Sequence, residues 1–312
     1  MLIHQTPAQL TDKLWMLGTA AYPLYLFRGA AAGTIFEGGV SAMGPLLLEQ
    51  IEQLGIARDF VKQVVVTHAH ADHVMAVPLL RKAFPGVTVL ASETAAKTLQ
   101  VEKAIAFFTK MDEALSGSLA AAGLIADRHR AEPLTGMQIA VDRTIAEGDA
   151  VEVDPGVAFE VLQTPGHSDC SLSFFEPGDR VLVVSDATGY YLPGHDYCWP
   201  NYFAGYEPYV ASMRRLAALD AEVLCLSHNA AIQGAADVQA YFDRDLAATE
   251  AYHRRIIDET RAGKPVRQLA EELGAEIYEK TQLLPLDFFQ KSCGLLVKLS
   301  LRHEGIEPEK GK

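Results

Sequence analysis

The segment that decides the fold is His68-Ala69-His70-Ala71-Asp72-His73, which directly follows the apolar run Val64-Val65-Val66-Thr67. A short apolar run of this kind predicts a buried strand, so four ligand-type side chains stand where a strand ends and a loop begins. Three imidazoles and a carboxylate this close together are difficult to place in an ordinary core, because each ring has two nitrogens to satisfy. A metal ion satisfies them, and zinc prefers N and O ligands of this kind.

Three further ligand-type residues follow apolar strands later in the chain. They are His167, Asp186 and His228, and each comes at or just after the carboxyl end of a predicted strand. Strand ends that run into loops present side chains on a rigid support. We therefore expect these residues to join the hexapeptide in one site.

The layout of apolar runs predicts two sheets packed face to face with helices outside, followed by an all-helical part from about residue 235 onward. A long helical pattern interrupts the strand series as an insertion near residues 93–123. Predicted strands cover residues 22–27, 33–37, 64–67, 87–91, 157–164, 171–175, 181–185 and 223–226.

The order H-x-H-x-D-H, distant His, Asp, final His resembles the metallo-β-lactamase superfamily, and specifically its dinuclear hydrolases; all seven positions are filled here. The resemblance implies an α/β fold, a four-layer αββα sandwich with a helical insertion and C-terminal helices. It also implies two domains. Residues 1–235 would form the metallo-β-lactamase-like domain with its insertion near 93–123, and residues 236–312 a C-terminal helical region covering the active site.

The same resemblance implies the role of each ligand. The first metal would be held by His68, His70 and His167, the second by Asp72, His73 and His228, and Asp186 would bridge them. It also implies a metal-bridging hydroxide as nucleophile, which Asp72 would help to orient as a catalytic residue. Imidazole and carboxylate tolerate Zn, Fe and Mn alike, so the two divalent ions are not identified by the ligand set.

Two branches of the superfamily remain close to this chain. One is the glyoxalase II-type thioesterases, and the other is the group of the pseudomonad quinolone-signal response protein, which the chain resembles in Glu37-Gly38-Gly39, the long insertion and the C-terminal helices. Both imply hydrolysis of a small acyl thioester, ester or lactone. The alternatives are a small-molecule phosphodiesterase, or a regulatory or partner-binding protein with incidental hydrolase activity.

Residues 189–209 contain eight aromatic side chains and three prolines, which is unlike an ordinary solvated loop. One interpretation is a lid or wall beside the metals, and the other is a loop packed on the C-terminal helices as a small core of its own. The two interpretations are compatible. The candidate substrate contacts in this segment are Tyr190, His195, Tyr197 and Trp199. In contrast, His253 lies within a helical pattern and is predicted to be a surface or packing residue.

The composition limits the partners of the protein. A formal net charge of −13 over 312 residues, without a basic run, argues against nucleic acid as a partner. There is no basic start followed by an apolar stretch and no apolar run of about 18 residues, so we expect neither a signal peptide nor a membrane span. The four cysteines are scattered, which is typical of reduced thiols in a cytoplasmic protein. The C-terminal helices could serve a homodimer.

Overall fold

The structure is a computed structural model that describes residues 1–307 apart from residues 132, 133, 135 and 137. The chain forms two compact units, and both are discontinuous in sequence. The first, called here the sandwich unit, consists of Met1–Gln163, Cys170–Ser185 and Asp220–Val238. The second, the helical unit, consists of Thr164–Asp169, Asp186–Leu219 and the described residues from Gln239 on. The predicted domains 1–235 and 236–312 stay a prediction beside this division.

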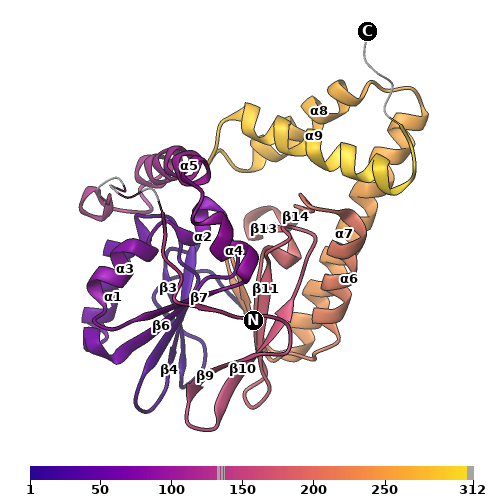
Figure 1. Ribbon diagram of the computed structural model, residues 1–312. Coiled ribbons are helices and arrows are strands. Elements are labelled where there is room, and N and C mark those ends of the chain that lie inside the picture. Colours follow the sequence, from indigo (N-terminus) through magenta and orange to yellow (C-terminus); the bar gives the residue numbers. More distant parts are fainter. Residues whose placement is uncertain (132–133, 135, 137, 308–312) are drawn as a thin grey trace. The chain divides into compact units, whose positions relative to one another are not determined.

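The histidine hexapeptide follows strand β6 of one seven-stranded sheet of the sandwich unit. Figure 1 labels β3, β4, β6 and β7 of this sheet. Its last four strands are parallel, so the carboxyl ends of β5, β6 and β7 lie at one edge. The strands, whose spatial order is also their chain order, are β2 (Ala8–Gln9), β3 (Leu14–Gly18), β4 (Pro23–Arg28), β5 (Gly33–Phe36), β6 (Val61–Val65), β7 (Thr88–Ala91) and β8 (Arg143–Thr144).

The other seven-stranded sheet of this unit is mixed. Because β11 is antiparallel to both β10 and β12, and β15 is parallel to β12, the carboxyl ends of β10, β12 and β15 lie at one edge. In spatial order the strands are β1 (Leu2–Ile3), β16 (Ala231–Gln233), β15 (Val223–Leu226), β12 (Val181–Ser185), β11 (Leu172–Glu176), β10 (Val157–Gln163) and β9 (Ala150–Asp154).

The core of the sandwich unit lies between these two sheets. Phe36 of the first sheet contacts Phe159 and Phe174 of the second, with ring centroids 4.6 and 5.3 Å apart, and all three rings are fully buried. At the edge that carries His68, the two sheets are joined by hydrogen bonds. Ser185 Oγ donates to Thr67 Oγ1 over 2.7 Å, and the Leu172 amide donates to the Thr67 carbonyl over 2.9 Å. The carboxyl ends of β6 in the first sheet and β12 in the second therefore lie close together.

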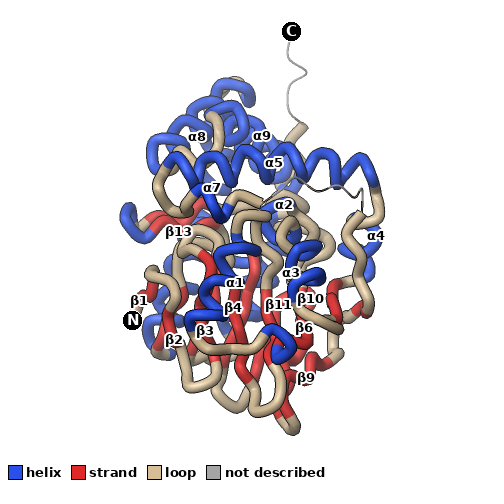
Figure 2. Tube along the Cα trace, turned by 90° about the vertical axis from the view of Figure 1, so that its left-hand side faces the viewer, coloured by secondary structure: helices blue, strands red, loops and turns tan. Residues whose placement is uncertain are grey.

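Helices cover the outer face of the first sheet, where α1 packs against β3 and α3 against β7 (Figure 2). The predicted insertion forms two helices, and the second of them, α5, packs against the short α2 that follows His70. Ser92 begins the insertion as an N-cap, accepting a hydrogen bond from the Ala95 amide. The helices are α1 (Met43–Gln53), η1 (Arg58–Phe60), α2 (Ala71–Val74), α3 (Val77–Ala83), α4 (Glu93–Thr98), α5 (Glu102–Ala121) and η2 (Asp127–His129).

The helical unit contains a two-stranded hairpin and four long helices, of which α8 and α9 pack along each other. The long helix α7 begins in the sandwich unit and continues into the helical unit. No helix in the described residues is long and apolar enough to cross a membrane. The elements are η3 (Asp186–Thr188), β13 (Tyr190–Leu192), η4 (Pro193–His195), β14 (Tyr197–Trp199), α6 (Tyr206–Ala217), α7 (Ala235–Arg261), α8 (Val266–Lys280) and α9 (Leu286–His303).

Substituting Phe159 by Ala should lower the free energy of unfolding by about 3–5 kcal/mol, because the cavity forms in the centre of the core between the sheets. The matched control is Phe107→Ala on α5, whose side chain is 59% exposed and should cost under about 0.5 kcal/mol. Urea unfolding measures both variants. Equal losses at the two positions would contradict the placement of the core.

Candidate metal centre

The sandwich unit brings five of the predicted ligands together at the joined edge of its sheets. The Nε2 atom of His68 lies 3.0 Å from Nδ1 of His70. The Oδ2 atom of Asp72 lies 3.5 Å from Nε2 of His73 and 3.6 Å from Nε2 of His228. Side chains far apart in the sequence therefore offer ligand atoms within the span of a metal coordination sphere.

The other nitrogen of three of these rings is held by the protein. Nδ1 of His73 donates to Glu37 Oε2 over 2.8 Å, and Nδ1 of His228 donates to the Ala21 carbonyl over 2.9 Å. Nδ1 of His68 lies 3.0 Å from Ser185 Oγ. A ring whose Nδ1 proton is engaged in this way presents its Nε2 lone pair, which is how metal-ligating histidines are normally oriented.

A chain of hydroxyl groups fixes the tautomer of His68. An ionised Glu37 only accepts hydrogen bonds, so Thr67 donates its proton to that carboxylate, over 2.9 Å. Ser185 in turn donates to Thr67. Since the Ser185 proton is used, its oxygen must accept the proton of His68 Nδ1. One buried carboxylate thus sets the orientation of two imidazoles, that of His73 directly and that of His68 through two hydroxyl groups.

The backbone around Glu37 is shaped for this role. Glu37 is 2% exposed and has a φ of 79°, which a residue with a side chain adopts at a cost. The next residue must be glycine, because a Cβ on Gly38 would lie 2.5 Å from the His73 carbonyl oxygen. The Gly38 amide donates to that same carbonyl over 2.9 Å, so the turn after β5 holds α2 and its two ligands in place.

The helical unit holds the other two predicted ligands. Nε2 of His167 lies 3.2 Å from Oδ2 of Asp186, and its Nδ1 donates to the Asn201 carbonyl over 2.9 Å. The preceding Gly166 has a φ of 129°, and a Cβ there would lie 2.2 Å from Cα of Tyr209. The backbone of α6 therefore packs directly on the turn that presents His167.

Burial distinguishes the ligands from one another. The imidazoles of His68, His73 and His228 are almost completely buried, whereas His70 is only partly buried and the Asp72 side chain is 25% exposed. His70 and Asp72 are therefore the members of this group that solvent reaches. The donors are all nitrogen and oxygen atoms, so the ligand set fits Zn, Fe or Mn, and no thiolate among them demands a softer ion.

The aromatic segment packs on the C-terminal helices within the helical unit, as the second interpretation of its sequence expected. Trp199 contacts Phe289 of α9 with ring centroids 5.7 Å apart, and Lys280 of α8 lies over the ring of Tyr197. His195 is exposed in η4. Tyr190 pairs with Trp199 across the β13–β14 hairpin, so the two share one face. Contact of these four residues with a substrate stays a prediction.

A carboxyl group of α7 lies buried behind this hairpin. Asp245 is fully buried beside the Cys198 thiol and the Arg244 guanidinium. Burial raises the pKa of Asp245 to about 8, an effect that the Cys198 thiol and the Arg244 guanidinium oppose. The group therefore stays protonated in the folded protein at pH values where a solvated carboxyl has long been ionised.

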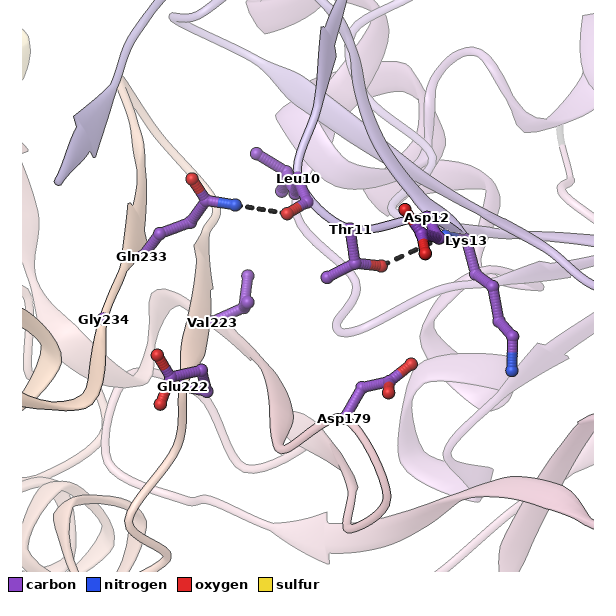
Figure 3. Close-up of a pocket in the computed structure, with 9 residues that line it drawn as sticks. All are labelled: Leu10, Thr11, Asp12, Lys13, Asp179, Glu222, Val223, Gln233 and Gly234. Atoms are coloured by element: carbon purple, nitrogen blue, oxygen red, sulfur yellow. Dashed lines mark hydrogen bonds between the residues drawn. The ribbon is translucent and has the colours of Figure 1, made fainter.

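A cavity of about 420 Å³ lies elsewhere in the sandwich unit (Figure 3). It opens beside the amino-terminal ends of β12 and β15, whereas the metal ligands follow the carboxyl ends of those strands. None of the predicted ligands lines it. The lining residues are Leu10, Thr11, Asp12, Lys13, Asp179, Glu222, Val223, Gln233 and Gly234.

Several supporting groups escaped the sequence analysis. Glu37 was noted there only as the end of a predicted strand and as part of a tripeptide that resembles one branch of the superfamily. Thr67 and Ser185 were noted only as strand residues. The carbonyl groups of Ala21 and Asn201 carry no signal in the sequence, because any residue supplies a carbonyl. Ser185 has a φ of 52° immediately before Asp186, an unusual backbone conformation that a structure shows and a sequence does not.

Comparison with known proteins shows the family to which the chain belongs. Residues 23–228 match the metallo-beta-lactamase superfamily. A hydroxyacylglutathione hydrolase of Cereibacter sphaeroides is 27% identical over 215 residues, or 68% of this chain. The chain spans 64% of the length of that relative. A probable metallo-hydrolase of Bacillus subtilis, YqjP, is 24% identical over 281 residues, covering 84% of this chain and 83% of its own.

Solved structures agree on the fold. A metallo-beta-lactamase family protein from Thermus thermophilus superposes with a TM-score of 0.62 at 22% identity, covering 95% of both chains. A superfamily protein from Sulfolobus tokodaii gives a TM-score of 0.54 at 19% identity, covering 79% of this chain and 84% of that one. The predicted fold class is thereby confirmed.

Replacing Glu37 by Gln should weaken metal binding about 10–100-fold, because the ring of His73 and the hydroxyl chain to His68 lose their anchoring charge. The control is Glu49→Gln, which alters a similar carboxylate–imidazole pair, Glu49 with His129, outside the cluster. Metal retained after dialysis against a weak chelator is the measurement. Equal retention by the two variants would rule out the anchoring role.

Replacing Asp245 by Asn should flatten the pH dependence of stability. Because the pKa of Asp245 is raised, its neutral form stabilises the folded protein fully below about pH 4. This contribution to the free energy of unfolding is lost as the pH rises to about 8, by up to about 1.4 kcal/mol per pH unit. The Asn variant should therefore gain on the wild type over this range. Asp243→Asn, an exposed change on the same helix, should behave as wild type in urea titrations at pH 5 to 9. A parallel course for all three proteins would refute the assignment.

Proposed function

Because the chain belongs to the metallo-beta-lactamase superfamily, we propose that it is a hydrolase that depends on two divalent transition-metal ions. The observation that carries the proposal is the engagement of Nδ1 in His68, His73, His167 and His228, which leaves Nε2 of each ring for a metal. A packing histidine has no need of this arrangement, and four histidines with Nδ1 engaged in this way favour a metal centre.

The full ligand set in this proposal is His68, His70 and His167 for one ion, Asp72, His73 and His228 for the other, and Asp186 as the bridge. Chain connectivity supports it. Asp186 directly follows Ser185, so the Cα atoms of these two residues are about 3.8 Å apart. The Ser185 hydroxyl in turn accepts a hydrogen bond from His68. His167 lies three residues before Cys170, whose Sγ accepts a hydrogen bond from the Ala69 amide over 3.3 Å.

Divalent ions in such a site lower the pKa of water and polarise the oxygen of a bound carbonyl group. The residues of this chain orient the reactants and move protons. Asp72, the most exposed member of its trio, would help to orient the attacking hydroxide and serves in this proposal as the catalytic residue. Glu37 holds the proton on Nδ1 of His73 and, through Thr67 and Ser185, that on Nδ1 of His68.

The proposed substrates are small acyl thioesters, esters or lactones. The C. sphaeroides relative, a hydroxyacylglutathione hydrolase by name, supports a thioester. The net charge of −13 disfavours a nucleic acid. In this proposal, residues 236–312 cover the site in a cytoplasmic enzyme, and the aromatic segment supplies the substrate contacts Tyr190, His195, Tyr197 and Trp199.

Parallel assays of an acyl thioester, a lactone and bis-p-nitrophenyl phosphate should show turnover of the carbonyl substrates. Removal of metal by a chelator should abolish it, and added Zn, Fe or Mn should restore it. Asp186→Ala should lower kcat/KM at least about 100-fold, since it removes the proposed bridge.

Asp59→Ala, an exposed change in η1, serves as the control and should keep full activity. Turnover of the phosphodiester alone would contradict the proposed carbonyl hydrolysis and would favour the alternative, a small-molecule phosphodiesterase. Undiminished thioester hydrolysis by fully metal-free protein would overturn the metal-dependent proposal.

A further inference from the structure

A second cluster of ligand-type residues lies in the helical unit, between α7 and the end of α9. His253, His303 and Glu304 each offer an atom within 4.8 Å of the others. Nε2 of His253 lies 3.4 Å from Oε1 of Glu304. That separation is long for a hydrogen bond of this type, but it equals the edge of a tetrahedron with metal–ligand bonds of about 2.0–2.1 Å, which is about 3.3–3.4 Å.

The ring of His253 is fixed in place by its neighbours. Tyr206, the first residue of α6, stacks on it with ring centroids 3.9 Å apart and planes inclined by 14°. The same tyrosine contacts His303 edge-on at 5.1 Å. One phenol ring thus orients both imidazoles before any ligand is present, which reduces the entropy that binding must cost.

The charged groups that face the cluster are Glu304, Arg254 and Arg261. His253 forms the buried side of the cluster, with 8% of its surface exposed. Nδ1 of that ring is buried and has no hydrogen-bond partner in the described part of the chain. Arg261 pairs with Oε2 of Glu304 at 3.7 Å, which leaves Oε1 directed to His253.

We propose that His253, His303 and Glu304 form a third metal site of this protein, one that binds a zinc-type divalent ion separately from the candidate centre. Two imidazoles and one carboxylate are a common zinc ligand set, with water at the fourth position. Because His303 and Glu304 are exposed, the ion enters directly from solvent.

A metal bound here would tie two helices together, with a residue of a third helix stacked on its ligands. His253 belongs to α7, His303 and Glu304 end α9, and Tyr206 begins α6. The aromatic segment is attached to α9 nearby, where the hydroxyl groups of Tyr202 and Ser300 lie 2.7 Å apart. A metal bound here would therefore secure the carboxyl end of α9 against α7.

The test compares the wild type with His303→Gln and Glu304→Gln, two changes of exposed side chains that leave the core intact, and with the control His4→Gln, an exposed histidine of the sandwich unit. Each protein is equilibrated with micromolar zinc, passed through a desalting column and analysed for bound metal. The wild type and the control should retain one equivalent more per chain than the two variants.

A second measurement follows thermal unfolding as zinc is added after the tighter sites are filled. The wild type should gain about 2–5 °C in Tm at roughly 100 times Kd, and His303→Gln should gain nothing. Equal zinc content and equal Tm in all four proteins would overturn the proposal. The readout is a difference of one equivalent, so it does not depend on activity or on how many ions the candidate centre holds.

Discussion

The carboxylate of Glu37 is the group on which the geometry of the candidate centre depends. It receives the Nδ1 proton of His73 and, through Thr67 and Ser185, stands at the end of a proton chain that begins at His68. The hydroxyl chain crosses from one sheet to the other, so the same hydrogen bonds that orient the ligands also join the two halves of the sandwich. The contacts that hold the two sheets together consequently also orient the candidate metal ligands.

The ligands could be predicted from sequence because they coincide with strand ends. The hexapeptide comes shortly after β6, Asp186 directly follows β12, and His228 lies two residues after the end of β15. The parallel strands β12 and β15 bring their carboxyl ends to one edge of their sheet. The eight predicted strands correspond to β4, β5, β6, β7, β10, β11, β12 and β15. The seven-residue ligand set itself stays a prediction that metal analysis must test.

The rest escaped prediction for physical reasons. The role of Glu37 depends on the lateral pairing of β5 with β6, which brings it beside Thr67 thirty positions later in the chain. The strand β16 has three residues, too few for a pattern. His253 packs in α7 as predicted, but its contact with His303 depends on how α9 returns to α7, which no local sequence pattern encodes.

The division of the chain has a consequence for how such a protein can evolve. The polypeptide passes between the sandwich unit and the helical unit five times. Two of these passages lie on either side of the segment Thr164–Asp169, which carries His167, and a third is the bond before Asp186. A unit connected in this way cannot be gained, lost or exchanged as a module by joining genes end to end. New specificities must therefore arise within each segment, by insertions or side-chain substitutions between the positions where the chain passes from one unit to the other.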